Sequence, residues 1–289
     1  ELISAKYGGD IPHRLNENIF VIDVPGTHKY MAETIEFYDA KHIIGSIQVA
    51  VQHKSGYRTG YSSDFSWPLD PDQIMQVDEL VIDATYGSLH SRHHHTLEEI
   101  KEAFAQTARQ QMARGPISIQ SHGGTLEHAL LCLNGIKPHW PIIADHQWTI
   151  DQLEVYNNNG YSINRDMISI ENNREATAEI MRNREYIRIY HYWSNITNQR
   201  FPNFLITAKF RNKQDPITTL SDNWSYAVPL SDHADIDGTL EFIEQSGATK
   251  VLCDSTRSQH AKDLASLIRS RLGIEAKASS NAPSLEWGT

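Results

Sequence analysis

Hydrophobic and polar positions follow two alternating kinds of pattern along the chain. Short apolar runs bounded by polar turn residues, such as 79–83 and 250–253, predict buried strands. Between such runs lie segments with apolar residues at helical spacing, such as 96–114 and 258–272. Because strands that alternate with helices are typical of parallel β/α units, the pattern predicts an α/β fold.

The predicted helix over 96–114 carries signals for both of its ends. Thr96 is followed three residues later by Glu99, which forms a capping box in which each side chain satisfies a backbone donor of the other residue. Gly115 and the proline after it end the helix.

Composition fits an ordinary globular protein. The 289 residues are 39% hydrophobic and 21% charged, and the formal net charge is −10. No apolar stretch approaches the roughly 20 residues needed to cross a bilayer, and no signal-peptide pattern is present, so we expect a soluble protein. Cys132 and Cys253 lie in apolar runs and are too few for a disulfide framework. Buried thiols of this kind indicate a reducing compartment, and the expected location is the cytoplasm.

The order of elements predicts one domain interrupted by another. Residues 88–205 contain a continuous series of strand and helix patterns, which predicts an α/β insertion. Residues 1–87 and 206–289 are expected to form the two parts of the domain that receives it.

Two polar residues follow predicted strands in the first part of the chain. His42 precedes a Gly-Ser turn between two β runs, a place from which an imidazole can enter a pocket. Asp64 follows a predicted strand, where a carboxylate can act as a ligand that bridges two metal ions. Taken alone, each is better explained by structure: His42 as a surface or structural histidine, and Asp64 as an Asx-turn residue.

Two further segments place acid–base groups at strand ends. Asp83 ends an apolar strand and would reach the carboxyl edge of the sheet, although a turn-forming aspartate explains it equally well. The sequence Ser-Asp-His-Ala-Asp over 231–235 packs three ionisable side chains into a strand-to-helix junction. Asp235 can cap the following helix. His233 can act as a general acid if a carboxylate holds its ring, and here we favour function over structure.

These four segments, in this order and spacing, resemble the metallo-β-lactamase-fold nucleases that carry a β-CASP insertion. That family includes RNA 3′-end-processing endonucleases, bacterial ribonucleases and DNA-repair exonucleases. The segments are Lys-His-Ile-Ile-Gly-Ser at 41–46, Ser-Asp-Phe at 63–65, Asp-Ala-Thr-Tyr-Gly at 83–87 and Ser-Asp-His-Ala-Asp at 231–235. The last is most similar to the small exonuclease branch of the family, and the resemblance extends over about residues 1–277.

The resemblance implies both a fold and a set of roles. It implies a metallo-β-lactamase αββα sandwich, incomplete at the N-terminus, with an inserted parallel α/β β-CASP domain. One or two zinc ions are expected, with His42 binding one ion and Asp64 bridging two. Asp83 would orient His233, and His233 would protonate the leaving oxygen of a phosphodiester.

The chain departs from the family at two motifs. The main His-x-His-x-Asp-His metal motif is absent, and the motif order implies that it would precede Glu1. Where the last family motif has a histidine, this chain has Asp254, which we expect as a third metal ligand. So few ligands leave it open whether the chain is active or degenerate.

Basic and aromatic residues gather in segment 181–213. It contains seven basic residues against the single acid Glu185, whereas the chain as a whole is acidic and a poor general binder of polyanions. Basic side chains for phosphates beside rings for base stacking are typical of a single-strand surface, although the rings are equally well explained as core. The residues predicted to contact nucleic acid are Arg182, Arg184, Arg188, Lys209, Arg211 and Lys213.

Two functional hypotheses follow. The first is a zinc-dependent phosphodiesterase, a nuclease with exonuclease character, acting on RNA or single-stranded DNA. The alternative is a catalytically degenerate β-CASP-family subunit that binds nucleic acid or a catalytic partner. RNA or DNA is the expected partner in both, and no membrane is expected. RNA or DNA as substrate, internal or terminal cutting, and a homodimer or a partner subunit all stay open.

Overall fold

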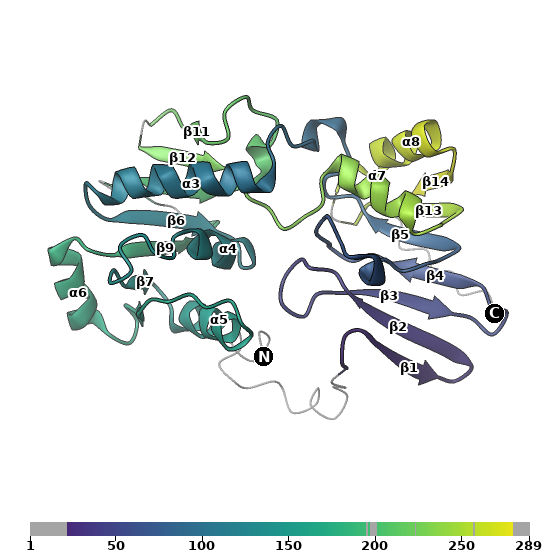
Figure 1. The fold of residues 1–289 in the computed structure, drawn as a ribbon, viewed down its shortest axis with the longest axis horizontal. Coiled ribbons are helices and arrows are strands. Elements are labelled where there is room, and N and C mark those ends of the chain that lie inside the picture. Colours follow the sequence, from purple (N-terminus) through teal and green to yellow (C-terminus); the bar gives the residue numbers. More distant parts are fainter. Residues whose placement is uncertain (1–21, 195, 197–200, 223, 257, 280–289) are drawn as a thin grey trace. The chain divides into compact units, whose positions relative to one another are not determined.

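Two seven-stranded sheets, each with its own helices and core, organise the chain (Figure 1). The computed structural model describes residues 22–194, 196, 201–222, 224–256 and 258–279. One sheet belongs to the inserted unit, His93–Ser231, and the other to the flanking unit, which is formed by the described residues of Val21–Arg92 and Asp232–Thr289. The predicted α/β class and the interruption of one unit by another are therefore present.

The sheet of the flanking unit has the order β1-β2-β3-β4-β5-β13-β14. Neighbours from β1 to β4 are antiparallel, and those from β4 to β14 are parallel. The predicted strand over 79–83 is confirmed, and the strand predicted over 250–253 runs one residue further. The strands are Gly26–Tyr30, Glu33–Asp39, Ile47–Gln52, Arg58–Tyr61, Glu79–Asp83, Lys250–Asp254 and Glu275–Ala278.

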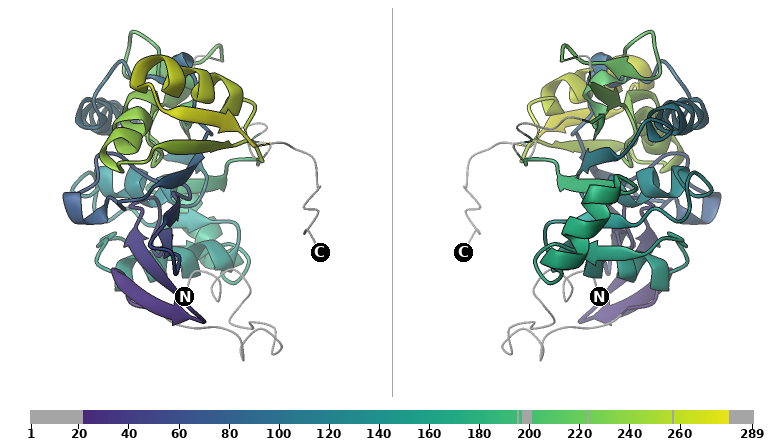
Figure 2. Two further views of the ribbon diagram at one scale, coloured as in Figure 1. Left: turned by 90° about the vertical axis from the view of Figure 1, so that its right-hand side faces the viewer. Right: turned by 90° about the vertical axis from the view of Figure 1, so that its left-hand side faces the viewer.

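Two helices cover one face of this sheet, α7 (Ile236–Gln245) and α8 (Ala261–Leu272). Figure 2 shows α8, coloured yellow, lying along strand β14 on one side of the sheet. The 3-10 turn η1 (Pro71–Gln73) lies between β4 and β5, and η2 (Leu89–Ser91) follows β5 just before the inserted unit. Asp235 accepts a hydrogen bond from the backbone N–H of Gly238, so its predicted role as the cap of α7 is confirmed.

The opposite face of the same sheet is also apolar. Ile35, Val49, Val51, Val81 and Leu252 alternate along their strands with the residues buried beneath α7 and α8, so they project from the other side. All five are half-buried. A sandwich would place a second sheet against such a face, but the described residues of the flanking unit form a single sheet.

The inserted unit is built on a mostly parallel sheet of order β11-β12-β10-β6-β9-β7-β8, in which only the β11–β12 pair is antiparallel. Parallel neighbours need crossover connections, and helices supply several of them. The strands are Ile117–Ser121, Ile142–Ala144, Met167–Ser169, Ile187–His191, Asn203–Ile206, Thr218–Thr219 and Ser225–Val228, numbered β6 to β12. The helices are α3 (Leu97–Met112), α4 (Thr125–Cys132), α5 (Gln147–Asn158), α6 (Arg174–Asn183) and the 3-10 turn η3 (Ala208–Phe210).

The predicted capping box at the start of α3 is confirmed. The Thr96 hydroxyl accepts from the Glu99 backbone N–H, and the Glu99 carboxylate accepts from the Thr96 backbone N–H. Within the described part of the chain, no helix combines the length and apolar character needed to span a bilayer.

The boundaries of the inserted unit differ from the predicted ones. Residues 206–231 were expected to belong to the second flanking part, but β12 pairs in parallel with β10, in the middle of the inserted sheet. Residues 88–92 belong to the flanking unit instead of the insertion. The sequence pattern marks the strands, whereas only their pairing shows to which sheet they belong.

A buried arginine closes the end of α4 in the inserted unit. The Arg165 guanidinium donates to the backbone carbonyls of Leu133, Ile136, Lys137 and Trp140. Leu133 is the C-cap of α4, and the other three carbonyls belong to the turns that follow this helix. Burial lowers the pKa of Arg165, but the four acceptors hold the charged side chain in place.

We expect Arg165→Met to lower the free energy of unfolding by roughly 3–5 kcal/mol, because four backbone carbonyls lose a charged and largely buried donor. Arg174→Met, an exposed position at the start of α6, is the matched control and should change stability by less than about 0.5 kcal/mol. Urea denaturation followed by circular dichroism measures both. Equal stability of the two variants would contradict the role given to Arg165.

An ion pair joins β2 to β4 in the flanking unit. Arg58 donates to the Glu36 carboxylate, which also accepts from the Tyr38 hydroxyl. The hydrogen bond from Arg58 is the main influence that lowers the pKa of Glu36, partly opposed by burial. A carboxylate with a lowered pKa stabilises the folded state when it is ionised.

This ion pair predicts a pH dependence of stability. The contribution of Glu36 should be fully present above its ordinary pKa of 4.5 and lost as the pH falls through its lower folded pKa. Glu36→Gln should therefore be less stable than the unaltered protein at pH 7, by about 1 kcal/mol, and the difference should shrink below pH 4.5. Urea titrations between pH 3 and 7 test this, and a difference independent of pH would refute it.

Candidate metal centre

His42 is held in a tight turn between β2 and β3. The Ser46 hydroxyl accepts hydrogen bonds from the backbone N–H groups of His42 and Ile43. Gly45 has a φ of +79°, which favours glycine, and this explains the Gly-Ser pair noted in the sequence. The turn fixes the direction of the His42 ring.

Asp64 follows β4 after a second constrained turn. Ser63 adopts a φ of +55°, in the left-handed region where glycine is favoured, and the resembling family motif has glycine at this position. The buried Ser62 hydroxyl donates to the carbonyl of Ser63 and accepts from the backbone N–H of Asp83. This serine therefore connects the segments that carry the two aspartates.

His233 reaches the same place from the loop before α7. The backbone N–H of Ala234, the next residue, donates to the carbonyl of Phe65, the residue after Asp64. Two segments about 170 residues apart in the chain are thus joined beside their functional side chains.

His42, Asp64 and His233 form one compact group. One ligand atom from each lies within 4.8 Å of the others. His42 Nε2 is 3.7 Å from Asp64 Oδ2, and the two imidazole centroids are 4.4 Å apart. Each of the three side chains is only 17% exposed. Three such donors can hold one ion and leave coordination positions for water or substrate.

Each histidine has its Nδ1 beside an oxygen. His42 Nδ1 is 3.3 Å from the backbone carbonyl of Asp232, and His233 Nδ1 is 3.5 Å from Asp83 Oδ2. Oxygen partners of this kind favour a proton on Nδ1 and leave Nε2 as the nitrogen that binds a metal ion. The arrangement therefore suits the chemistry of the donor set.

Asp83 is set to support His233. Thr85 donates to its carboxylate through both backbone and hydroxyl. Burial alone would raise the pKa of Asp83, but the hydrogen bonds from His233 and Thr85 outweigh it, so the pKa is lowered. Asp83 thus stays a carboxylate that can orient a histidine, as the resemblance implied.

The electrostatics of the group favour a cation. Burial, followed by the nearby charge of His233, lowers the pKa of His42, so the ring is neutral near pH 7. A neutral imidazole is the form that binds metal ions. Asp64, Asp83 and the buried Asp232 gather around the two rings, and a divalent cation would offset their negative charge.

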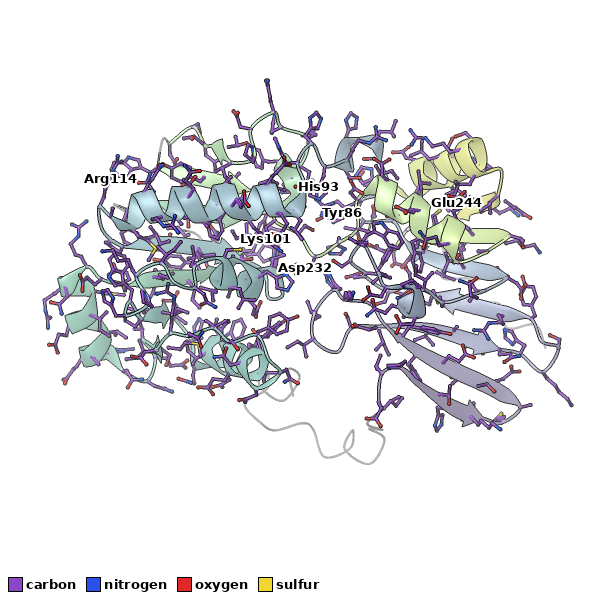
Figure 3. All side chains as sticks on the ribbon, viewed as in Figure 1. Tyr86, His93, Lys101, Arg114, Asp232 and Glu244 are labelled. Atoms are coloured by element: carbon purple, nitrogen blue, oxygen red, sulfur yellow. The ribbon has the colours of Figure 1, made fainter. Side chains whose placement is uncertain are left out.

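Tyr86 and Asp232, labelled in Figure 3, complete the surroundings and were not assigned roles from the sequence. Tyr86 packs edge-on against the His233 ring, with centroids 5.1 Å apart. Asp232 supplies the carbonyl for His42. Both lie within motifs that the sequence displays, but neither role follows from spacing alone.

Asp254 lies outside the group of three. Its strand pairs with β5 so that Asp254 is opposite Asp83 in the register. Its carboxylate accepts from the backbone and hydroxyl of Thr256, forming a local turn. Among the described residues, the structure brings His42, Asp64 and His233 together as a ligand group and does not include Asp254.

The six predicted nucleic-acid contacts divide into two kinds. Arg188 is 5% exposed and pairs with Asp145, and Arg211 is 2% exposed. Because both side chains are buried, these two arginines are structural and unavailable to a strand on the surface. Four basic residues remain exposed: Arg182, Arg184, Lys209 and Lys213.

Comparison with known proteins defines a family but no activity. The sequence matches no protein-family profile. It is 31% identical over 115 residues to an uncharacterized protein in the lig 3′ region of Acidianus ambivalens, covering 39% of this chain and 80% of that protein. The chain belongs to the same family as this archaeal protein.

A solved structure shares the fold. A protein of unknown function from Enterococcus faecalis V583 matches with a TM-score of 0.51 at 10% identity, over 81% of this chain. The chain spans 61% of the length of that protein. At this identity the match concerns the fold alone.

We expect the protein to bind Zn²⁺ or Co²⁺ through this group. Loss of a residue that only supports a metal ligand weakens metal binding by roughly 10–100-fold. Asp64→Ala should weaken metal binding by more than this, because it removes the anionic ligand itself. His53→Ala, a half-exposed histidine paired with Glu33 in the same unit, should bind as the unaltered protein does. Isothermal titration calorimetry and the visible absorption of Co²⁺ report both variants. Equal weakening by the two substitutions would exclude the group as the binding site.

Proposed function

We propose that the protein is a metal-dependent phosphodiesterase, a nuclease that cuts RNA or single-stranded DNA. The observation that carries the proposal is the group of His42, Asp64 and His233, with Asp83 behind the ring of His233. These are the residues through which the sequence resembles β-CASP nucleases of the metallo-β-lactamase fold. Exonuclease cutting is proposed because the segment around His233 is most similar to that branch.

The residues divide the chemistry between them. When bound, zinc supplies polarisation of the phosphoryl group and activation of water. His42 and Asp64 would hold the ion, and their positions are fixed by the Ser46 and Ser62 hydrogen bonds. His233 donates a proton to the leaving oxygen, with Asp83 holding its Nδ1. Zinc is proposed because an imidazole and a carboxylate are ligands that suit it.

The substrate class rests on charge. Arg182, Arg184, Lys209 and Lys213 are exposed on the inserted unit of an otherwise acidic protein. Exposed basic side chains neutralise phosphates and make binding depend on salt. This supports a polyanionic substrate without selecting RNA over DNA.

The finer fold is part of the same proposal. We infer a metallo-β-lactamase-type sandwich with a β-CASP insertion, supported by the apolar second face of the flanking sheet and by the parallel inserted unit. Both cysteines are free thiols, which supports the cytoplasm as the location.

A degenerate, non-catalytic subunit is the second candidate function. It is favoured by one observation: Asp254 stands where the resembling motif has a histidine, and its carboxylate is engaged by Thr256. Three ligands are also fewer than a two-metal centre requires. Such a subunit would bind nucleic acid, or a catalytic partner, without cutting.

Cleavage and zinc content of the His233→Ala variant show whether His233 is the general acid or a metal ligand. If His233 is the acid, the variant should lose cleavage by roughly 10²–10⁴-fold and keep its zinc. Asp64→Asn should lose both. His260→Ala, a partly exposed histidine paired with Asp263 in the same unit, is the control and should cut normally. Oligonucleotides labelled at the 5′ or the 3′ end measure cleavage, and elemental analysis measures zinc.

Each result has a distinct meaning. Loss of zinc together with cleavage in His233→Ala would make His233 a ligand and remove its role as the acid. Absence of cleavage in the unaltered zinc-loaded protein, with nucleic-acid binding retained, would refute the enzyme and favour the non-catalytic subunit.

A further inference from the structure

The inserted unit contains a cavity that the proposed metal chemistry does not use. Its volume is about 420 Å³, and it lies at the carboxyl ends of β6, β7 and β9, beside the start of α5. In parallel α/β sheets, small ligands bind at this edge, because the loops after the strands converge there.

Aromatic rings form much of its wall. Trp148 and His191 line the cavity with their ring centroids 6.4 Å apart, and His146, which also lines it, lies nearly parallel to Trp148 at an interplanar angle of 16°. Tyr190 contributes a fourth lining ring. Flat rings with one edge in solvent are suited to stacking on another planar ring.

The row of rings continues beyond the cavity. His122 contacts His191 edge-on at 5.8 Å and stacks on Tyr192 at 4.2 Å. Trp193, 75% exposed, packs against both His122 and Tyr192. Burial lowers the pKa of His122, which keeps this stacked ring neutral. Exposed rings in a series are the usual platform for successive bases of a single strand.

One acidic group is fixed at the wall of the cavity. Asp145 lines it, and Asp145 Oδ1 accepts from the buried guanidinium of Arg188. The structure gives Oδ2 no hydrogen-bond donor among the described residues, and the Asp145 side chain is 43% exposed. An ionised carboxylate only accepts hydrogen bonds, so it selects ligands that carry N–H or O–H groups.

We propose that this cavity binds a single nucleobase that carries an exocyclic amino group: adenine, cytosine or guanine. Trp148 and His191 would provide the stacking surface, and Asp145 Oδ2 would accept from the amino group. The cavity has the size of one base with its sugar, and Thr149 and Gln152 offer further polar contacts.

Two alternatives fit the lining less well. No lysine or arginine lines the cavity among the described residues, so a phosphate would find no cation there. In uracil and thymine the one free N–H lies between two carbonyl oxygens. These oxygens would face the Asp145 carboxylate, which cannot donate a hydrogen bond to them. The ligand chemistry is therefore the amino-bearing base itself, either in a free nucleotide or in a strand.

Isothermal titration calorimetry with AMP, CMP, GMP and UMP tests the proposal. The protein is kept metal-free with EDTA, so the outcome is independent of the proposed phosphodiesterase. The three amino-bearing nucleotides should bind at least tenfold more tightly than UMP. Trp148→Ala should weaken the binding of AMP at least tenfold, which is the loss expected for one stacked base. Trp224→Ala, an exposed tryptophan of the same unit outside the cavity, should have no effect.

Asp145→Asn provides the second test, because asparagine accepts and donates and so tolerates uracil. The variant should bring AMP and UMP within about threefold of each other. Should it fail to fold by circular dichroism, the ranking of nucleotides on the unaltered protein still tests the carboxylate. Equal affinity for AMP and UMP there would overturn the proposal, as would unchanged AMP binding in Trp148→Ala.

Comparing a short oligonucleotide with AMP shows whether the base comes from a strand or from a free nucleotide. A hexanucleotide of deoxyadenosine that binds at least tenfold more tightly than AMP, and depends on Trp193 as well as Trp148, would identify a strand. Equal affinity with no dependence on Trp193 would identify a free nucleotide. A pyranose sugar that displaces AMP at equal concentration would overturn the assignment to a base, because aromatic walls also bind sugars.

Discussion

One backbone hydrogen bond, from the N–H of Ala234 to the carbonyl of Phe65, fixes the candidate metal centre. It joins the loop before α7 to the turn after β4, and the residues preceding these two, His233 and Asp64, become neighbours. The Ser62 hydroxyl adds the end of β5 through the backbone of Asp83. A backbone bond does not depend on side-chain rotamers, so the positions of both functional residues follow from the main chain. His42 is added by its contact with the carbonyl of Asp232.

Both units place their polar residues in the same way. In the flanking unit Asp83 ends the parallel strand β5, and in the inserted unit the cavity lies at the ends of β6, β7 and β9. Apolar residues of β5, β6, β7 and β9 are buried in the two cores, so these strands give rigid positions to whatever follows them. The turn after β4 can likewise carry the strained Ser63, because the sheet to which β4 belongs holds both ends of the turn. Chemistry is thus concentrated at strand ends, and stability in the strands.

Some basic side chains of the inserted unit are buried and structural, whereas others are exposed, and composition does not distinguish the two kinds. Arg165 and Arg188 are both buried, one against four carbonyls and the other against Asp145. Removing either from water costs free energy that its partners must offset. The exposed basic residues of the inserted unit have no such role and are the ones available to a polyanion. Counting positive charges along a segment therefore overstates the surface that can bind nucleic acid.

The local elements could be predicted from the residues alone: the strand over 79–83, the capping box of Thr96 and Glu99, and the Asp235 cap of α7. These depend on side-chain periodicity and on hydrogen bonds between residues three apart, which are visible in a short window. The sequence also selected His42, Asp64 and His233 as candidates. Three findings needed the three-dimensional structure: His42, Asp64 and His233 meet without Asp254, β10 and β12 belong to the inserted sheet, and Arg188 and Arg211 are buried. Each of these depends on contacts between residues far apart in sequence, where strand pairing and burial, rather than local pattern, set the energy.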